Sequence, residues 1–380
     1  MKKLIYLDYA AASPVDPIVL KAMEPYFSDS FYNPSAEYLP ARAVRKDLEA
    51  ARSSVACSLG AKTTEIIFTA GGTEANNLAI RGVMEKFPGT NMVLSAIEHD
   101  SVIGPSQLYK NKQAPVNQDG IVDIAKLINL IDNQTVLISV MCCNNEVGSI
   151  QPVNKISAAI DVIRKERLLK GNKLPIYLHS DAAQAGNYLD VHVARLGVDL
   201  LTINGGKIYG PKQSGALFVK TGVSLLPQIL GGGQEYGIRS GTENVAADVG
   251  LAKALSLAQE RRQSEFHRLR QLQTQFIGLL EEKIPSVIIN GSVKYRLVNN
   301  IHITLPGKDN ERVLMLLDEA GILAAAGSAC SASNEEPSHV LMAMGVSDSF
   351  ARSSIRFTMG RDTDLISLQK VIAVLCSLPI

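Results

Sequence analysis

A lysine stands directly after two glycines and between two apolar segments of the chain. Residues 204–212 read NGGKIYGPK, with VDLLTI before them and GALFV shortly after, so Lys207 lies between two predicted strands. A lysine in this place can be an exposed loop residue, a phosphate ligand or a covalent catalyst. A P-loop has Ser or Thr directly after its Gly-Lys pair, and Ile208 follows here, so that phosphate motif is excluded.

Other polar side chains follow predicted strands in the same way. The strand EIIFTA leads to GGTEANN, where Gly72 and Thr73 begin a predicted helix and could bind a phosphate, although Thr73 could equally be an ordinary helix cap. The side chains that follow other predicted strands are His99, Asn145, Asp181 and Gln184. Because ligands bind beyond the carboxyl ends of parallel strands, we expect these residues to share one site.

These residue types together match what pyridoxal phosphate requires. This cofactor needs a lysine that holds it as a Schiff base and an acidic partner for its pyridinium nitrogen. Lys207 and Asp181 suit those two roles, and the helix start at Gly72 and Thr73 suits the phosphate. The sequence therefore predicts pyridoxal phosphate as the cofactor.

The elements that must position these residues alternate along the chain. Predicted strands cover residues 65–70, 91–96, 134–142, 174–180, 198–204 and 214–219, with helical stretches between several of them. This alternation indicates an α/β fold with a mostly parallel sheet. A long helical region from Thr242 to about Lys283 leads away from it. We predict a large cofactor-binding domain of residues 16–260, and a small α+β domain of residues 1–15 and 261–380.

Composition narrows the class of protein. The net charge of +1 gives no electrostatic reason to expect direct binding of nucleic acid or of an anionic membrane. Five cysteines without zinc-finger spacing indicate neither a disulfide framework nor a metal site, and favour a reduced, cytoplasmic setting. No run of 18 apolar residues is present, and the N-terminal apolar stretch is too short for a signal peptide.

The sequence resembles the cysteine desulfurases of the class-V aminotransferase family, of the group I, iron–sulfur-cluster type. The resemblance runs nearly end to end through YLDYAAASPVDP, YNPSA, FTAGGTEANNLAIRG, EHDSV, NNEVGSIQP, HSDAAQ, KIYGPK, GGGQEYGIRSGTEN, GSACSAS, EPSHVLMAMG and SSIRFTMGR. It implies the fold-type I architecture of pyridoxal enzymes, whose large domain has a seven-stranded, mostly parallel sheet. It also implies a homodimer that takes sulfur from L-cysteine, leaves L-alanine and passes the sulfur to an acceptor protein.

The resemblance also implies residue roles. Lys207 would bind the cofactor covalently, Asp181 would pair with the pyridinium nitrogen, and His99 would stack on the ring and serve as acid or base. Further cofactor contacts would come from Gly72, Thr73, Asn145, Gln184, Asn204, Gly206 and, in the neighbouring subunit's site, Thr242. Arg356, assisted by Asn33, would bind the substrate carboxylate. Cys330, in GSACSAS, would be the nucleophile that becomes a persulfide. The other four cysteines are expected to be structural.

Three departures from the family pattern stand out. Residues 204–207 read NGGK where Ser-x-His-Lys is usual, so the phosphate should lose one side-chain donor, while Asn204 and the Gly206 N–H remain. YNPSAEYLP lacks a usual histidine, and Tyr236 replaces a common arginine. The NGGK and NPSAEYLPA variants are similar to those of desulfurases that supply DNA phosphorothioation. Cluster assembly or tRNA thiolation remains the more general interpretation.

Two other functions stay open at this point. A different pyridoxal reaction, such as transamination of a small amino acid, would have no use for Cys330. A scaffold that keeps the fold without turnover would explain the missing histidine, but Lys207, Asp181, Cys330 and Arg356 argue against it.

Overall fold

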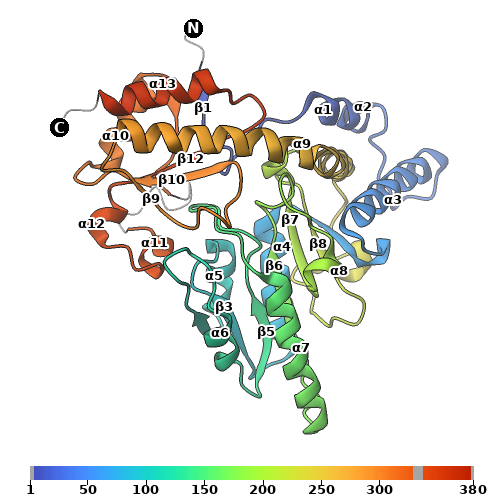
Figure 1. Ribbon diagram of the computed structural model, residues 1–380. Helices are drawn as coiled ribbons and strands as arrows, with labels where there is room; N and C mark the ends of the chain where they lie inside the picture. The colour runs from blue at the N-terminus through green and yellow to red at the C-terminus, as the bar shows by residue number, and fades with distance from the viewer. Residues whose placement is uncertain (1–3, 328–336, 378–380) are drawn as a thin grey trace.

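A seven-stranded sheet forms the centre of the protein (Figure 1). The computed structural model describes residues 4–327 and 337–377. The strand order is β2-β8-β7-β6-β5-β3-β4, and all neighbouring pairs from β7 to β4 are parallel, whereas β8 is antiparallel to both β2 and β7. The strands are β2 (Ile66–Thr69), β3 (Asn91–Ser95), β4 (Lys110–Ala114), β5 (Thr135–Ser139), β6 (Tyr177–Asp181), β7 (Leu200–Asn204) and β8 (Gly215–Val219). The predicted mostly parallel sheet is confirmed.

Helices cover both faces of this sheet because its strands are apolar on both faces. In β3, Met92 and Leu94 pack into the cluster that contains helix α4, whereas Val93 packs into the large cluster on the opposite face. Beside the sheet lie α1 (Pro17–Met23), α2 (Pro25–Ser28), α3 (Leu39–Leu59), α4 (Gly72–Lys86), α5 (Asp100–Ser106), α6 (Ile124–Leu130), α7 (Val153–Leu169) and α8 (Val193–Leu196), with 3₁₀ turns η1 (Thr63–Glu65), η2 (Gly205–Lys207) and η3 (Glu235–Gly237).

The sequence analysis missed strand β4. Its residues, KNKQA, are polar and mostly exposed or half-exposed, and the strand lies at the edge of the sheet next to β3. An edge strand can be polar on both faces, so it lacks the apolar pattern that identified the other strands.

The second part of the chain builds two smaller sheets. Helix α9 (Val245–Lys283) leads to an antiparallel sheet of order β12-β10-β9, and β1 pairs with β11 in parallel. The elements are β1 (Ile5–Tyr6), β9 (Ile288–Ile289), β10 (Asn300–Thr304), β11 (Ile322–Leu323), β12 (Ser354–Thr358), α10 (Asn310–Glu319), α11 (His339–Ala343), α12 (Asp348–Ala351) and α13 (Leu365–Cys376). The predicted smaller α+β part is therefore present, and the N-terminal strand belongs to it.

The exact division into domains stays a prediction. The boundary proposed at residue 260 falls inside α9, whose 39 residues form one helix. Helix α9 contacts α3 and α1 beside the large sheet and α13 beside the small one. Figure 1 shows this helix running between the two parts. In residues 4–327 and 337–377, no helix has both the length and the apolar character required to span a membrane.

Candidate active site

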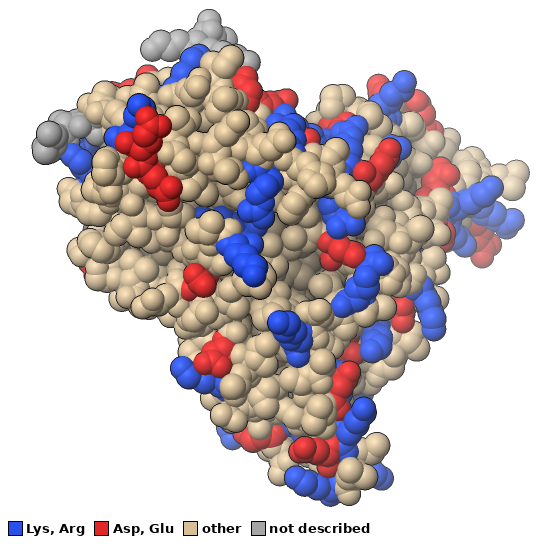
Figure 2. Space-filling model, in the orientation of Figure 1, with Lys and Arg blue, Asp and Glu red and all other residues tan. Residues whose placement is uncertain are grey.

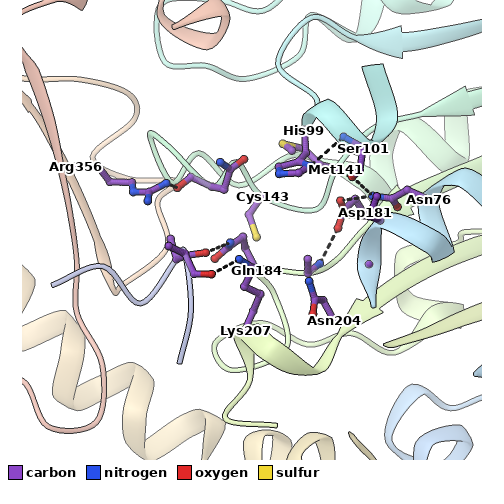
Figure 3. Close-up of a pocket in the computed structure, with 16 residues that line it drawn as sticks. Asn76, His99, Ser101, Met141, Cys143, Asp181, Gln184, Asn204, Lys207 and Arg356 are labelled. Carbon is purple, nitrogen blue, oxygen red and sulfur yellow. Dashed lines mark hydrogen bonds between the residues drawn. The ribbon is translucent and has the colours of Figure 1, made fainter. Parts of the chain in front are cut away.

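A cavity of about 160 Å³ lies where the carboxyl ends of the parallel strands meet the N-terminal segment and β12. Its lining contains most of the residues selected from the sequence (Figure 3). These are Gly72, Thr73, His99, Asn145, Asp181, Gln184, Asn204, Lys207 and Arg356. The side chains come from many separate elements, and the strand ends bring them together as the α/β topology predicts.

Lys207 ends the 3₁₀ turn η2, directly after strand β7. Its ammonium group donates to the carbonyl oxygen of Ala11 in the N-terminal segment. Asn204 accepts the Gly206 N–H at 3.1 Å through Oδ1 and thereby caps the turn. The Gly206 N–H is therefore engaged by Asn204 and is not the exposed phosphate donor expected from the sequence. Gly206 itself does not line the cavity, while the amide nitrogen of Asn204 stays beside Gly72.

The predicted phosphate site is the N-terminus of α4. The N-cap residue is Gly71, which has φ of 103° and no side chain that could cap the first-turn amides. These amides and the hydroxyl of Thr73 stand at the positive end of the helix dipole, at the edge of the cavity. The packing is close, because a Cβ on Gly72 would lie 3.2 Å from Asn204 Nδ2. An anion bound here would meet Asn204 as well as the helix N-terminus.

Asp181 is the last residue of β6 and is 7% exposed. Its Oδ1 accepts the Ala183 N–H at 2.8 Å, and its Oδ2 accepts from Asn76 Nδ2 at 2.8 Å. Two donors on a nearly buried side chain fix the direction of the carboxyl group. Asp181 thus has the fixed orientation that the expected pairing with a ring nitrogen requires.

The structure places three further predicted residues around the same cavity. His99 is the N-cap of α5, and its Nδ1 accepts the Ser101 N–H at 3.1 Å. Gln184 donates from Nε2 to the Ala10 carbonyl oxygen at 2.9 Å. Asn145 accepts a hydrogen bond from Arg356 through its backbone oxygen at 3.0 Å.

Arg356, on β12, is a nearly buried cation with 1% of its surface exposed. Its guanidinium donates to Asp8 Oδ1 at 2.6 Å and to the Asn145 carbonyl oxygen at 3.0 Å, while the buried Nε has no hydrogen-bond partner among the described residues. Asp8 orients the guanidinium from the side of the N-terminal segment, and Arg356 still lines the cavity. This arrangement suits recognition of a substrate carboxylate.

Two predicted residues lie elsewhere. Asn33 and Thr242 line a different cavity together and do not border the one that contains Lys207. Asn33 Oδ1 accepts the Ser35 N–H at 2.8 Å, so this side chain stabilises its own turn. Within one chain, therefore, Asn33 is not brought to Arg356 as the sequence analysis expected.

Sequence reasoning missed several cavity residues. Asn76, Ser101 and Met141 line the cavity, and the backbone of Ala10 and Ala11 closes one side of it. An Asn or Ser on a helix has no spacing signal that separates it from an ordinary surface residue. The stretch YLDYAAAS contains no pattern that predicts hydrogen bonds from Gln184 and Lys207 to the backbone oxygens of Ala10 and Ala11. Their only available signal was membership of the matching motifs.

The cysteines differ in what they can do. Cys330 lies outside the described residues. Burial raises the pKa of Cys142 to about 12, and that of Cys143 well above the ordinary value. Although Cys143 borders the cavity, it stays a thiol at neutral pH and is a poor nucleophile. Cys57 and Cys376 are exposed, and neither lines this cavity.

Glu98 is fully buried just before His99. Its Oε1 accepts the Met141 N–H at 2.8 Å, and Oε2 has no hydrogen-bond partner among the described residues. Burial, with a smaller effect from the Asp181 carboxylate, raises the pKa of Glu98 to about 8. The folded protein therefore binds this proton more tightly than the unfolded chain. The stability that this proton contributes is fully present below about pH 4 and is lost as the pH rises through about 8.

Replacing Glu98 with glutamine should remove this pH dependence. Glutamine keeps the shape of the protonated carboxyl group and does not titrate, so the fall in unfolding free energy from about pH 4 to about pH 8 should be shallower in Glu98→Gln. Urea unfolding at a series of pH values measures it. Glu85→Gln is the control, because the pKa of this outer glutamate is lowered by Gln228, Tyr109 and Arg81. Equal slopes in wild type and Glu98→Gln would contradict the assignment.

The residues present fit pyridoxal phosphate. An amine on Lys207, a held carboxylate on Asp181 and an uncapped helix N-terminus at Gly72 face one cavity. Their chemistry matches an aldehyde, a pyridinium nitrogen and a phosphate, the three groups by which this cofactor is bound.

Comparison with known proteins agrees with this site. The aminotransferase class-V family model matches residues 5–367. The chain is 41% identical over 382 residues to cysteine desulfurase IscS of Dictyoglomus turgidum. The aligned region covers 99% of this chain and 94% of that protein. Among solved structures, a NifS-like protein has a TM-score of 0.90 at 29% identity, covering 99% of this chain and 100% of the other. SspA in complex with cysteine has a TM-score of 0.80 at 33% identity, covering 93% and 98%.

Both the family match and the full-length identity to cysteine desulfurases confirm the resemblance found in the sequence, and the fold confirms its architecture. The chain belongs to the class-V aminotransferase family and, within it, to the pyridoxal phosphate-dependent cysteine desulfurases.

Proposed function

We propose that this enzyme converts L-cysteine to L-alanine and collects the sulfur as a persulfide on Cys330, for transfer to an acceptor protein. One observation carries the proposal: Lys207, Asp181, His99 and Arg356 line a single cavity, and the described residues on both sides of positions 328–336 contact Arg356 or the sequence neighbours of cavity residues. A transaminase would need the first four residues but would have no use for Cys330.

The described residues on either side of positions 328–336 form hydrogen bonds to residues at or next to the cavity. Before them, Ala325 forms a bridge with Arg356, in which the Arg356 N–H donates to the Ala325 oxygen at 2.6 Å. After them, Ser338 donates to Glu146 Oε2 at 2.5 Å, and His339 Nε2 lies 3.0 Å from the backbone oxygen of Glu98. Glu146 and Glu98 are the sequence neighbours of Asn145 and His99. The described residues that flank positions 328–336 therefore contact Arg356 or the sequence neighbours of cavity residues on both sides.

The chain's own residues then have defined tasks. Arg356 binds the substrate carboxylate. Asp181 keeps the ring nitrogen of the cofactor protonated. The bound cofactor would then accept electrons from the α-carbon of the substrate. Lys207 moves protons at the cavity, and His99 stacks on the cofactor ring and donates a hydrogen bond to the reacting groups. The Cys330 thiolate attacks the substrate sulfur: the S–S bond forms, the carbon–sulfur bond breaks, and carbon keeps the electron pair and takes up a proton. No outside oxidant is needed.

The test is an assay of the purified protein with L-cysteine. Alanine and reductant-released sulfide should appear in equal amounts, and the protein should show the visible absorbance of bound cofactor. A protein that stays inert after added pyridoxal phosphate would favour the scaffold function. With a keto acid added to accept the amino group, conversion of L-cysteine to 3-mercaptopyruvate in place of alanine would favour transamination.

Gly206→His should strengthen cofactor retention. A Cβ at Gly206 would meet nothing closer than 3.5 Å, so the backbone accepts a side chain there. A histidine would restore the donor usual in the family, and a hydrogen bond to a charged phosphate contributes about 1.5–3 kcal/mol, or roughly tenfold to a hundredfold in affinity. Titration of the apoprotein with the cofactor measures this. Equal affinity in both proteins would show that the NGGK sequence does not weaken cofactor binding.

The homodimer is a further part of the proposal. Phe27, Phe31 and Leu39 expose 69%, 66% and 77% of their surfaces, and exposed apolar side chains that lie together mark interaction sites. Phe31 lies with Asn33 and Thr242 around the cavity that is separate from Lys207. A second subunit covering this surface would bring Thr242 toward the neighbouring site. Light scattering should give about twice the chain mass of 40.9 kDa, and a monomer would contradict this arrangement.

The pathway that receives the sulfur stays a prediction. The net charge is +1, and Figure 2 shows basic and acidic side chains interspersed on the face that it presents. This distribution favours a protein acceptor over direct contact with nucleic acid. The NGGK sequence is similar to that of desulfurases that supply DNA phosphorothioation, while cluster assembly or tRNA thiolation is the more general proposal. Transfer of radiolabelled sulfur from Cys330 to purified carrier proteins of each pathway would decide among them.

A further inference from the structure

Three hydrogen bonds connect Asp181 to His99 through two residues without an assigned role. Asn76 on α4 donates from Nδ2 to Asp181 Oδ2 at 2.8 Å, and the same nitrogen lies 2.8 Å from Ser101 Oγ. Ser101 Oγ in turn lies 2.8 Å from His99 Nδ1. Asn76 is 1% exposed and Ser101 is 8% exposed, so water does not compete for these bonds. Figure 3 shows the four side chains side by side.

The donors and acceptors allow only one direction along this chain. A carboxylate only accepts, so the Asn76 atom that faces Asp181 must be the NH₂ group and not the amide oxygen. The second hydrogen of that NH₂ group points to Ser101 Oγ, which therefore accepts. The hydroxyl hydrogen of Ser101 is then left for His99 Nδ1. Asp181 fixes the orientation of Asn76, and Asn76 fixes that of Ser101.

The backbone gives the same answer independently. The Ser101 N–H donates to His99 Nδ1 at 3.1 Å, so this ring nitrogen already receives a hydrogen before the hydroxyl is considered. A nitrogen that accepts two donors cannot carry a proton of its own. A neutral imidazole has one N–H, which must then be on Nε2.

We propose that Asn76 and Ser101 are positioning residues that hold His99 as its Nε2–H tautomer, so that His99 presents a hydrogen-bond donor to the reacting groups. The inference rests on the proposed function for the role of His99 and deepens it. In this form His99 donates a hydrogen bond from Nε2 to the reacting groups, while Nδ1 stays engaged by Ser101. Because the Asn76 amide also donates to Asp181, this one side chain orients both Asp181 and, through Ser101, His99.

The tautomer can be measured without turnover. The protein contains six histidines, and ¹⁵N-histidine labelling with long-range proton–nitrogen correlation separates protonated from bare ring nitrogens. His99→Gln identifies the signals of His99 by their loss. With cofactor bound and before L-cysteine is added, Nδ1 of His99 should resonate as a bare nitrogen and Nε2 as a protonated one. A protonated Nδ1 would overturn the proposal even if the enzyme proved to be an active desulfurase.

Substitution tests the two residues. Ser101→Ala should move the His99 Nδ1 signal and lower kcat about tenfold, with KM for L-cysteine little changed. Ser106→Ala is the matched control, because Ser106 is also a buried serine of α5, and its hydroxyl donates to the Ile103 oxygen at 2.7 Å within the same helix. Asn76→Ala should move the His99 signals as well. Unchanged His99 signals in Ser101→Ala and Asn76→Ala would remove the positioning role.

Discussion

Replacing Lys207 with alanine should lower the formation of alanine from L-cysteine by about 10²–10⁴-fold, the range for loss of a group that transfers protons. The structure indicates that this loss comes from the side chain of Lys207 and not from a change in the fold. Lys207 ends the turn η2, and its ammonium group reaches the N-terminal segment across the cavity to Ala11. Its backbone oxygen accepts from Asn187 Nδ2 at 2.8 Å, so the turn survives loss of the side chain. The variant should fold and lack both the covalent link to the cofactor and the base.

The neighbouring lysine supplies the control. Lys212 belongs to the same glycine-rich segment and donates to the Ser13 oxygen at 2.9 Å, but it does not line the cavity. Alanine formation should stay within about threefold of wild type in Lys212→Ala, and the visible absorbance should disappear only in Lys207→Ala. Similar losses in both variants would mean that the segment acts through its fold, and the assignment of Lys207 would fall.

Cys330→Ala is expected to abolish desulfuration while the cofactor stays bound. Loss of the covalent nucleophile should reduce alanine formation by at least about 10³-fold. The cofactor contacts proposed for Lys207, Asp181 and Gly72 lie outside residues 328–336, so the visible absorbance should match that of wild type. Mass spectrometry of wild type after brief exposure to L-cysteine should find one additional sulfur atom on Cys330.

Cys57→Ala is the comparison for this change. Cys57 is an exposed free cysteine on α3 that does not line the cavity, and its replacement should leave the rate unchanged. Full activity of Cys330→Ala would exclude a persulfide at this position. Cys143 would then be the next cysteine to test, since it borders the cavity despite the raised pKa of its thiol.

The sequence by itself predicted every strand of the large sheet except β4, and most of the residues that line the cavity. Buried parallel strands are short apolar runs, and the polar residues that follow them must gather at one edge, which is why Asp181 and Lys207 could be paired in advance. The same logic failed for strand β4, whose polar residues sit at the sheet edge. The resemblance supplied Arg356, which lies on a different sheet.

Tertiary structure alone decided the hydrogen-bond partners of these residues. Asn76 and Ser101 meet because α4 packs against α5, and no spacing in the sequence reports the distance between two helices. Asp8 reaches Arg356 across 348 positions of the chain, and only folding of the N-terminal segment onto β12 brings them together. Short-range pattern determines which residues can do chemistry. The packing of distant elements determines which way each of them points and which proton it carries.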